Sequence, residues 1–232
     1  MGIRVELRGV SYIYPGSKSR ALKNVSITLR NGMCYGVTGP NGSGKTTLLK
    51  IISLLYKPTD GHVLYNGTDP WGGDITSYRK RVVYVHEKPV MVRGSVLDNL
   101  ALGLRIRGYN GDQIKERIER IAVKLDLSPL LDRNARDLSA GQRQLVAIAR
   151  ALVLDPDVIA LDEPYSNIDF RKRKRLSRVV NALRGKGKLV VISSHDIGLL
   201  VSLCDYIIYL ENGEIVLEGP AGEVYRELLS EH

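Results

Sequence analysis

The sequence predicts an α/β fold built around a mostly parallel β-sheet, and three stretches carry this prediction. The first is a glycine-rich segment, Gly39–Thr46, between a short apolar stretch, Met33–Thr38, and an apolar run of helical length, Thr47–Leu55. The others are Val158–Glu163, which ends in two carboxylates, and Leu189–Ser193, which is apolar almost throughout. Strands that are apolar on both faces are typical of parallel sheets covered by helices on either side.

Length and composition limit the class of protein. A chain of 232 residues, 44% of them hydrophobic, can bury the core of one α/β domain. No apolar run reaches the roughly 18 residues of a membrane span and no secretory signal opens the chain, so we expect a cytosolic protein. Cys34 and Cys204 lack C-x-x-C spacing, and we expect buried free thiols. The net charge of +9 leaves nucleic acid, anionic lipid and nucleotide open as partners.

Short strands are expected on both sides of the glycine-rich segment. Ile3–Leu7 alternates apolar and charged residues, and Ala21–Leu29 is a second candidate strand. After the turn Pro58–Gly61, His62–Tyr65 is a third. Arg81–Val85 has the apolar character of a buried strand. The sheet pattern stops there.

A helical region is predicted to follow. Ser95–Leu104 and Gln113–Leu125 space their apolar residues as helices do. We expect residues 87–139 to form a helical subdomain beside the sheet, and residues 1–86 and 140–232 to form the core. The run Val90-Met91-Val92 in this region is open to two interpretations, a small satellite core or a docking surface for a partner helix.

The glycine-rich segment fits the phosphate-binding pattern G-x-x-x-x-G-K-[ST] without a mismatch. Its glycines let the backbone turn so that successive N–H groups point at phosphate oxygens. Lys45 adds a positive charge for the β- and γ-phosphates, and the Thr46 hydroxyl is a ligand for Mg²⁺. The residues expected to hold the nucleotide here are Gly39, Pro40, Asn41, Gly42, Ser43, Gly44, Lys45, Thr46 and Thr47.

A second anion site is expected at Leu138–Gln142, which opens a helix that continues to Leu152. Ser139 is a natural N-cap for this helix. The small residues Ala140 and Gly141 let a ligand approach the N–H groups of the first turn. The chain therefore carries two candidate anion sites, roughly 100 residues apart in sequence.

Polar side chains are expected at the carboxyl edge of the sheet, where the buried strands end. Asp162 suits Mg²⁺ coordination, and Glu163 suits activation of an attacking water. A lone histidine is more often structural, but His195 directly after a central strand is a candidate γ-phosphate sensor. Tyr14, just before the turn Pro15-Gly16, could offer its ring to adenine, although spacing alone favours packing on the sheet.

In this order and at these intervals, the phosphate loop, Leu138–Gln142, Asp162-Glu163 and His195 resemble the ATP-binding cassette (ABC) ATPases, from about Val5 to Gly219. The resemblance implies a P-loop NTPase fold with an N-terminal antiparallel β subdomain and a helical subdomain inserted between Q-loop and signature. Leu138–Gln142 resembles the signature LSGGQ, with Ala140 in place of the first glycine.

The resemblance also implies roles for single residues. Tyr14 resembles the aromatic that stacks on adenine, and His195 resembles the switch histidine that acts in catalysis with Glu163 and Lys45. Ser166–Asp169 resembles the D-loop of the dimer interface. The family's Q-loop usually has glutamine where this chain has Glu87, so Glu87 is expected to join Thr46 and Asp162 as an Mg²⁺ ligand.

Partners follow from the family geometry, in which ATP lies between the phosphate loop of one cassette and the signature helix of another. Since this chain has both halves, a homodimer with ATP and Mg²⁺ is expected. The resemblance implies an importer ATPase at the cytoplasmic face of the cell membrane. It would dock on transmembrane permease subunits through Val90-Met91-Val92 and be served indirectly by a solute-binding protein.

The sequence also bears on the transported cargo and on other classes of P-loop protein. Lys88–Met91 with Gly103–Gly108 resembles the tungstate and related oxyanion importers. A non-transport ABC ATPase acting on nucleic acid or ribosomes would use the +9 charge, but usually has a coiled coil or second cassette, so no nucleic acid is expected. An unrelated P-loop kinase or GTPase would leave Leu138–Gln142 and His195 unexplained.

Overall fold

The computed structural model describes residues 2–166 and 168–230, and these contain two β-sheets. The strands are β1 (Arg4–Ile13), β2 (Arg20–Arg30), β3 (Cys34–Thr38), β4 (Asp60–Tyr65), β5 (Val82–Val85), β6 (Val158–Asp162), β7 (Leu189–Ser193), β8 (Tyr206–Glu211) and β9 (Glu214–Pro220). The small sheet is antiparallel with the order β2-β1-β4. The large sheet has the order β5-β6-β7-β3-β8-β9, parallel except for β9.

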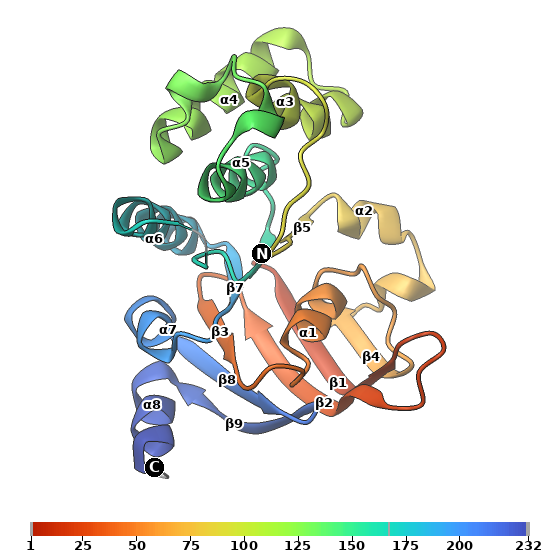
Figure 1. The fold of residues 1–232 in the computed structure, drawn as a ribbon. Coiled ribbons are helices and arrows are strands. Elements are labelled where there is room, and N and C mark those ends of the chain that lie inside the picture. Colours follow the sequence, from red (N-terminus) through yellow and green to blue (C-terminus); the bar gives the residue numbers. More distant parts are fainter. Residues whose placement is uncertain (1, 167, 231–232) are drawn as a thin grey trace.

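Helices cover both faces of the large sheet. The α-helices are α1 (Lys45–Ile52), α2 (Ile75–Arg79), α3 (Val96–Ile106), α4 (Gly111–Leu125), α5 (Ala140–Leu152), α6 (Phe170–Gly185), α7 (Ile197–Leu203) and α8 (Ala221–Ser230). Short 3₁₀ turns lie at Pro70–Gly72, Ser128–Leu130 and Ala135–Asp137. Figure 1 shows α3 and α4 gathered with α5 at the end of the molecule away from the small sheet. The predicted α/β fold, with its antiparallel N-terminal sheet and inserted helices, is confirmed.

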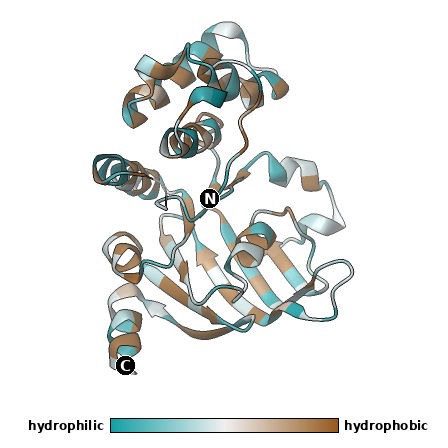
Figure 2. Cartoon of the chain, viewed as in Figure 1, coloured by the Kyte–Doolittle hydropathy of each residue, from teal (hydrophilic) through white to brown (hydrophobic). Residues whose placement is uncertain are grey.

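The core has two parts that lie on opposite faces of the large sheet. One cluster packs α1 between the two sheets, and the other packs helices from α3 to α8 against the opposite face. Alternate residues of β6 enter each cluster: Val158 and Ala160 face α1, whereas Ile159 and Leu161 face the other helices. This two-sided burial explains why the central strands are rich in apolar residues. In Figure 2 the visible strands of the molecule carry brown segments among white and teal ones.

Several element boundaries differ from the sequence prediction, and α2, α6, α7, α8 and the β8–β9 hairpin were not predicted. Helix α1 begins at Lys45, inside the glycine-rich motif, and ends at Ile52, because Leu54 adopts a positive φ of 57°. Helix α6 was missed because its apolar positions are few among basic residues. The β8–β9 hairpin was also missed, although the turn Asn212-Gly213, with both φ angles positive, is a standard hairpin signal.

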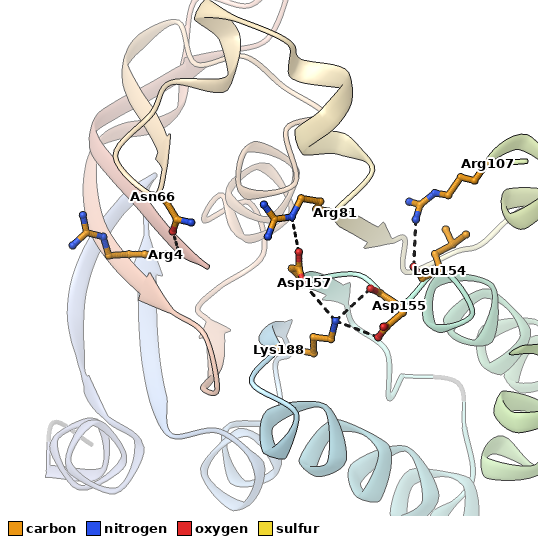
Figure 3. Close-up of polar contacts among 8 residues, drawn as sticks. All are labelled: Arg4, Asn66, Arg81, Arg107, Leu154, Asp155, Asp157 and Lys188. Atoms are coloured by element: carbon orange, nitrogen blue, oxygen red, sulfur yellow. Dashed lines mark hydrogen bonds and ion pairs between the residues drawn. The ribbon is translucent and has the colours of Figure 1, made fainter. Parts of the chain in front are cut away.

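The amino ends of the parallel strands are joined by ion pairs (Figure 3). Arg81 before β5 donates from Nε to Asp157 Oδ2 before β6, at 2.6 Å. Lys188 before β7 reaches Asp157 at 3.4 Å and Asp155 at 3.2 Å. These contacts hold the edge opposite to the phosphate-loop motif, so the carboxyl edge remains available for ligands.

The run Val90-Met91-Val92, predicted as a docking surface, is only partly exposed. Met91 is only 9% exposed and packs in the core, whereas Val90 is 80% exposed. The prediction of a surface role is therefore wrong for Met91, because its side chain turns inward from a short loop between the two apolar neighbours.

Cys34 and Cys204 are buried, as expected. Among the described residues, no helix is both long and apolar enough to cross a bilayer.

Candidate nucleotide-binding site

A pocket of about 320 Å³ lies at the carboxyl edge of the large sheet. It brings together side chains that are up to 181 residues apart in the chain. Its lining consists of Tyr14, Ala21, Asn41, Gly42, Ser43, Gly44, Lys45, Thr46, Thr47, Glu87, Asp162, Glu163 and His195. Apart from Ala21, all of these were predicted site residues. Ala21 was not predicted; it belongs to β2, next to the loop that carries Tyr14.

The loop backbone requires glycine at defined points. Gly39 has a φ of 136°, and a Cβ there would lie 1.9 Å from the carbonyl oxygen of Leu210. Gly44 has a φ of 107°, and a Cβ would lie 2.6 Å from the carbonyl oxygen of Ala21. Both positions combine a left-handed backbone with close approach of another strand, so a side chain is excluded twice.

Lys45 is held by the loop that it follows. Its ammonium donates to the carbonyl oxygens of Gly39 and Pro40, both at 2.8 Å. Burial lowers the pKa of Lys45, and the carboxylates of Glu163 and Asp162 oppose that shift. Phosphate oxygens are charged acceptors and bind an ammonium more strongly than neutral carbonyls do. Gly39 and Pro40 thus contact Lys45 rather than line the pocket itself.

Asp162 is buried and accepts hydrogen bonds from three hydroxyls. Thr46 and Tyr84 each donate to Oδ2 at 2.8 Å, and Ser193 donates to Oδ1 at 2.6 Å. Burial and the Asp162 carboxylate raise the pKa of Tyr84, so its hydroxyl stays a donor. The adjacent oxygens of Thr46 and Asp162 are hard donors of the kind that Mg²⁺ takes together with phosphate oxygens and water.

Tyr84 and Ser193 were missed by the sequence analysis. The signal for Ser193 was available, since it ends β7 and pairs in register with Asp162 at the end of β6. Tyr84 lies 78 residues before Asp162, on the strand that flanks β6 from the other side. Its contact depends on the strand order, which the sequence pattern does not contain.

Glu163 has a strained backbone and an unpartnered oxygen. Its φ is 45°, and its N–H donates to Ser193 Oγ at 2.9 Å. Oε1 is buried without a hydrogen-bond partner; His195 Nε2 lies 3.4 Å away, beyond good hydrogen-bond geometry. Burial raises the pKa of Glu163 to about 7, with Asp162 and Glu87 adding to the shift and Lys45 opposing it. A carboxyl group with one buried oxygen lacking a hydrogen-bond partner and a pKa of about 7 suits proton abstraction from water.

Glu87 and Tyr14 lie at the edges of the pocket. Glu87 is part of the pocket lining together with Thr46 and Asp162. The Tyr14 hydroxyl lies 2.9 Å from Thr47 Oγ1, and its ring packs edge-on against Tyr12 and Tyr56, with centroids 5.1 and 5.8 Å away. Tyr14 is thus both packed in an aromatic cluster and present at the pocket. Its contact with adenine and the metal role of Glu87 stay predictions.

The predicted second anion site lies outside this pocket. Ser139 caps α5 by accepting from the Gln142 N–H at 3.2 Å, and Gln142 Oε1 accepts from the Ser139 N–H at 2.9 Å. Ser139 and Ala140 are exposed, and none of residues 139–142 lines the pocket. Within the predicted D-loop, Asn167 lies outside the described residues, and Asp169 caps α6.

A separate groove of about 370 Å³ contains Val90 but not Met91. It lies among β5, α3 and α5 and is lined by Val83, Tyr84, Val85, His86, Pro89, Val90, Leu102, Gly103, Ile106, Ala147, Arg150, Ala151 and Leu154. Ile106 and Val90 are its most exposed apolar residues. Arg150 donates to the carbonyl oxygen of Val90 at 3.2 Å and fixes the loop against α5.

Comparison with known sequences places these features in a family. A model described as "ABC transporter" matches residues 22–166. The chain is 35% identical over 224 residues to an energy-coupling factor transporter ATP-binding protein of Halalkalibacterium halodurans, covering 95% of this chain and 80% of that protein. It is 34% identical over 232 residues to a phosphate import ATP-binding protein of Thermotoga maritima, covering 95% and 91%. A sulfate/thiosulfate import ATP-binding protein of Pseudomonas syringae is 36% identical over 227 residues, covering 95% and 68%.

Solved structures agree with this result. A dimeric ATP-binding cassette in a post-hydrolysis state, bound to ADP and Pi, matches with a TM-score of 0.87 and 29% identity, covering 94% of this chain and 98% of that chain. A component of an ABC transporter complex from Clostridium perfringens matches with a TM-score of 0.85 and 26% identity, covering 97% and 91%.

Proposed function

Because the chain belongs to the ABC transporter family of ATP-binding proteins, we propose that it is the ATPase subunit of an importer and acts as a homodimer. One solved structure similar to this chain is a dimeric cassette in a post-hydrolysis state, and another is part of an ABC transporter complex, which supports this proposal. The proposal assigns this chain to the cytoplasmic face of the membrane, with a solute-binding protein as an indirect partner. The observation that carries the chemistry is the buried, unpartnered Oε1 of Glu163 inside the pocket that contains Lys45 and Asp162.

The pocket residues divide the work of hydrolysis between them. Lys45 exchanges its carbonyl partners at Gly39 and Pro40 for the phosphates, which places positive charge where negative charge develops. Glu163 Oε1 accepts the proton of the attacking water, and His195 Nε2 lies 3.4 Å from that oxygen. Thr46 and Asp162 with Glu87 would hold Mg²⁺, which supplies charge neutralisation on the phosphates.

The other half of the active site is proposed to come from a second copy. Residues 139–142 form an exposed, capped helix start, yet they are absent from the pocket lining of their own chain. A helix N-terminus is a site for phosphate oxygens. Two copies arranged head to tail let each helix start complete the pocket of the other, and each then hydrolyses ATP.

A mixing experiment tests this composite site. Ser139→Arg and Lys45→Ala should each abolish hydrolysis in a homodimer, whereas a heterodimer of the two carries one site with both lesions and one site with neither. Phosphate release should therefore return on mixing, towards about one quarter of the wild-type rate for random pairing with independent sites. Absence of recovery, with heterodimers demonstrated by a tag, would refute composite sites. Binding of labelled ATP to each variant controls for misfolding.

The groove beside α3 is the proposed permease contact. Its apolar, exposed Val90 and Ile106 can receive an apolar helix of a membrane subunit. Val90→Asp should leave the isolated ATPase active and release the subunit from permease-containing membranes. Met91→Asp is the matched core change, and it should lower stability instead, since it buries a charge. Retention of the Val90→Asp protein on such membranes would show that docking occurs elsewhere.

The proposed cargo is tungstate or a related oxyanion. Two relatives are named for import of phosphate and of sulfate or thiosulfate, which are oxyanions. The test is stimulation of ATP hydrolysis in the reconstituted transporter by tungstate, molybdate, sulfate or phosphate, with an uncharged sugar as control. Stimulation by none of the oxyanions would reject this cargo class while leaving the ATPase assignment intact.

A further inference from the structure

A pocket of about 410 Å³ lies between α4, the end of α5 and α6, and shares no residue with the nucleotide pocket. Pockets of this volume are in the range that holds small organic ligands, about 300–1,000 Å³. Its lining is Arg120, Ile121, Val123, Lys124, Leu152, Asp155, Arg175, Arg178, Val179, Ala182, Leu183 and Lys186. The two classes of lining residue, basic and apolar, indicate what it can bind.

The basic residues of this pocket are largely uncompensated. Asp155, its one carboxylate, is already paired with Lys188 at 3.2 Å (Figure 3), and Arg175 is paired with Asp126 at 2.5 Å. Among the described residues, no carboxylate is in ion-pair distance of the other four pocket cations: Arg120, Lys124, Arg178 and Lys186. The pocket therefore has a net positive charge.

The net positive charge of the whole chain comes from the segment that forms one side of this pocket. Residues 171–188 contain nine Lys and Arg residues and no Asp or Glu. The remaining 25 basic residues balance the 25 acidic ones, so this segment accounts for the full net charge of +9. Four of the nine are ion-paired, namely Lys172, Arg175, Arg184 and Lys188. The positive field of the other five attracts anions to the pocket beside them.

The floor of the pocket is apolar. Ile121, Leu152 and Val179 are buried beneath it, while Val123 is 71% exposed at its edge. A polyanion such as nucleic acid needs cations along an open surface and gains nothing from an apolar cavity. An apolar floor beside unpaired cations instead complements a ligand with both characters. We propose that this pocket binds an amphiphilic anion, a carboxylate or phosphate carried on a single apolar chain.

Dodecanoate below its micelle concentration is a suitable probe, with binding to the full chain measured by calorimetry. It should bind with one site per chain, and more tightly than inorganic phosphate or dodecyltrimethylammonium. Val123→Asp, at an exposed position that tolerates a charge, and Arg178→Glu should each weaken binding about tenfold. Lys174→Glu on the same helix, outside the pocket, is the matched control and should change it less than about twofold.

Four outcomes would overturn the proposal. If dodecyltrimethylammonium bound as tightly as dodecanoate, the pocket would be an apolar groove without preference for anions. Phosphate binding as tight as dodecanoate would remove the role of the apolar floor. Unchanged affinity of Val123→Asp for dodecanoate would likewise remove the role of the apolar residues. An oligonucleotide that displaces dodecanoate from wild type and still binds Val123→Asp normally would assign the basic helix to nucleic acid instead. Dodecyl phosphate in place of dodecanoate, and lysolipid vesicles in place of either, identify the head group.

An independent observation concerns the two cysteines. The Sγ atoms of Cys34 and Cys204 lie 3.1 Å apart in the core. Their backbones are tied together, because the Asp205 N–H donates to the Cys34 carbonyl oxygen at 2.9 Å and the Cys34 N–H donates to Asp205 Oδ2 at 2.8 Å. The two sulfur atoms need to approach by only about 1 Å to reach the length of a disulfide bond, about 2.05 Å.

The geometry points to an intramolecular disulfide between Cys34 and Cys204 that forms when the chain meets a peroxide or a small disulfide oxidant. With hydrogen peroxide, the two thiols lose two protons and two electrons as the S–S bond forms, and the O–O bond breaks to give two waters. The bond would join β3, which leads into the phosphate loop, to the end of α7, which follows His195. The hydrogen bond with the Cys204 thiol and burial raise the pKa of Cys34, so oxidation is slow in the folded chain.

The test is refolding of the full chain with oxidised glutathione, followed by intact mass and peptide mapping without reductant. The oxidised chain should be two hydrogens lighter, with a single cross-linked peptide. Its Tm should rise by about 5–15 °C over the reduced chain, because the bond closes a long loop. Cys34→Ala controls for other effects of the oxidant and should show no rise. Two titratable thiols, or glutathione adducts on both cysteines, would overturn the inference.

Discussion

Removal of the Ser193 hydroxyl should destabilise the protein more than any other single-atom change at the site. Ser193 is fully buried, and its Oγ donates to Asp162 Oδ1 at 2.6 Å while accepting from the Glu163 N–H at 2.9 Å. Ser193→Ala deletes both contacts and leaves a buried carboxylate oxygen and a buried N–H without this partner. A lost bond to a charged group costs about 1.5–3 kcal/mol, and an unsatisfied buried donor about 1–3 kcal/mol.

Because the two losses share one oxygen atom and the site can relax, we expect a net cost of about 3 kcal/mol. For a chain of this length, about 2–4 °C of Tm accompanies each kcal/mol, so Tm should fall by about 6–12 °C. Hydrolysis should fall as well, since Ser193 fixes both carboxylates. The assays are thermal unfolding by circular dichroism without nucleotide, and phosphate release with ATP.

Ser194→Ala is the matched control. Ser194 is also buried, but its hydroxyl accepts a single bond, from the Asp196 N–H at 3.1 Å, outside the carboxylate network. Its loss should cost about 1 kcal/mol, or about 2–4 °C. If Ser193→Ala unfolds within about 2 °C of wild type, or no lower than Ser194→Ala, the hydroxyl does not support the two carboxylates as argued.

The remaining predictions concern the same pocket. Glu163→Gln should bind ATP and hydrolyse it about 10²–10⁴-fold more slowly, and near-normal phosphate release would move the base elsewhere, for example to His195. Since the pKa of Glu163 is raised to about 7 from 4.5, the folded state keeps a proton between these pH values that the unfolded state loses. Without nucleotide and metal, the Tm of wild type relative to Glu163→Gln should therefore fall as pH rises from about 4.5 to 7 and then level off. A Tm difference that rises over this range would contradict the argument. Tyr14→Ala should weaken ATP binding about three- to tenfold in an equilibrium titration, and Tyr14→Phe, which keeps the ring, should not. ATP affinity should depend more steeply on Mg²⁺ in wild type than in Glu87→Gln, and superimposable titrations would mean that Glu87 does not reach the metal.

Local sequence was enough to predict the phosphate loop and the carboxyl-edge residues. Gly39 and Gly44 occupy positions that no other residue can, so their spacing in the sequence is diagnostic of the loop conformation. Asp162 follows an apolar run of strand length, and its place at the sheet edge follows from that run. Ser139 is predictable as a helix start because its hydroxyl and Gln142, three residues later, satisfy each other within one turn.

Other properties depended on contacts between distant parts of the chain. Val90 and Met91 are equally apolar neighbours, and only the packing of α3 and α5 decided that Met91 is buried and Val90 exposed. The order β5-β6-β7 decided that Tyr84 and Ser193 both reach Asp162. Strand order has no periodicity of its own in a sequence.

The chemistry of Glu163 was decided at the same level. From the sequence alone, this carboxyl group would be assigned the ordinary pKa of a glutamate. Its pKa of about 7 arises because the fold buries it among charged groups from three separate stretches of the chain. Likewise, nothing between Cys34 and Cys204 in the sequence indicates that their sulfur atoms touch. The sequence by itself thus determined which groups the site contains, since local backbone and burial patterns select residue types. The tertiary structure determined their environment and partners, since those depend on residues brought together from distant positions.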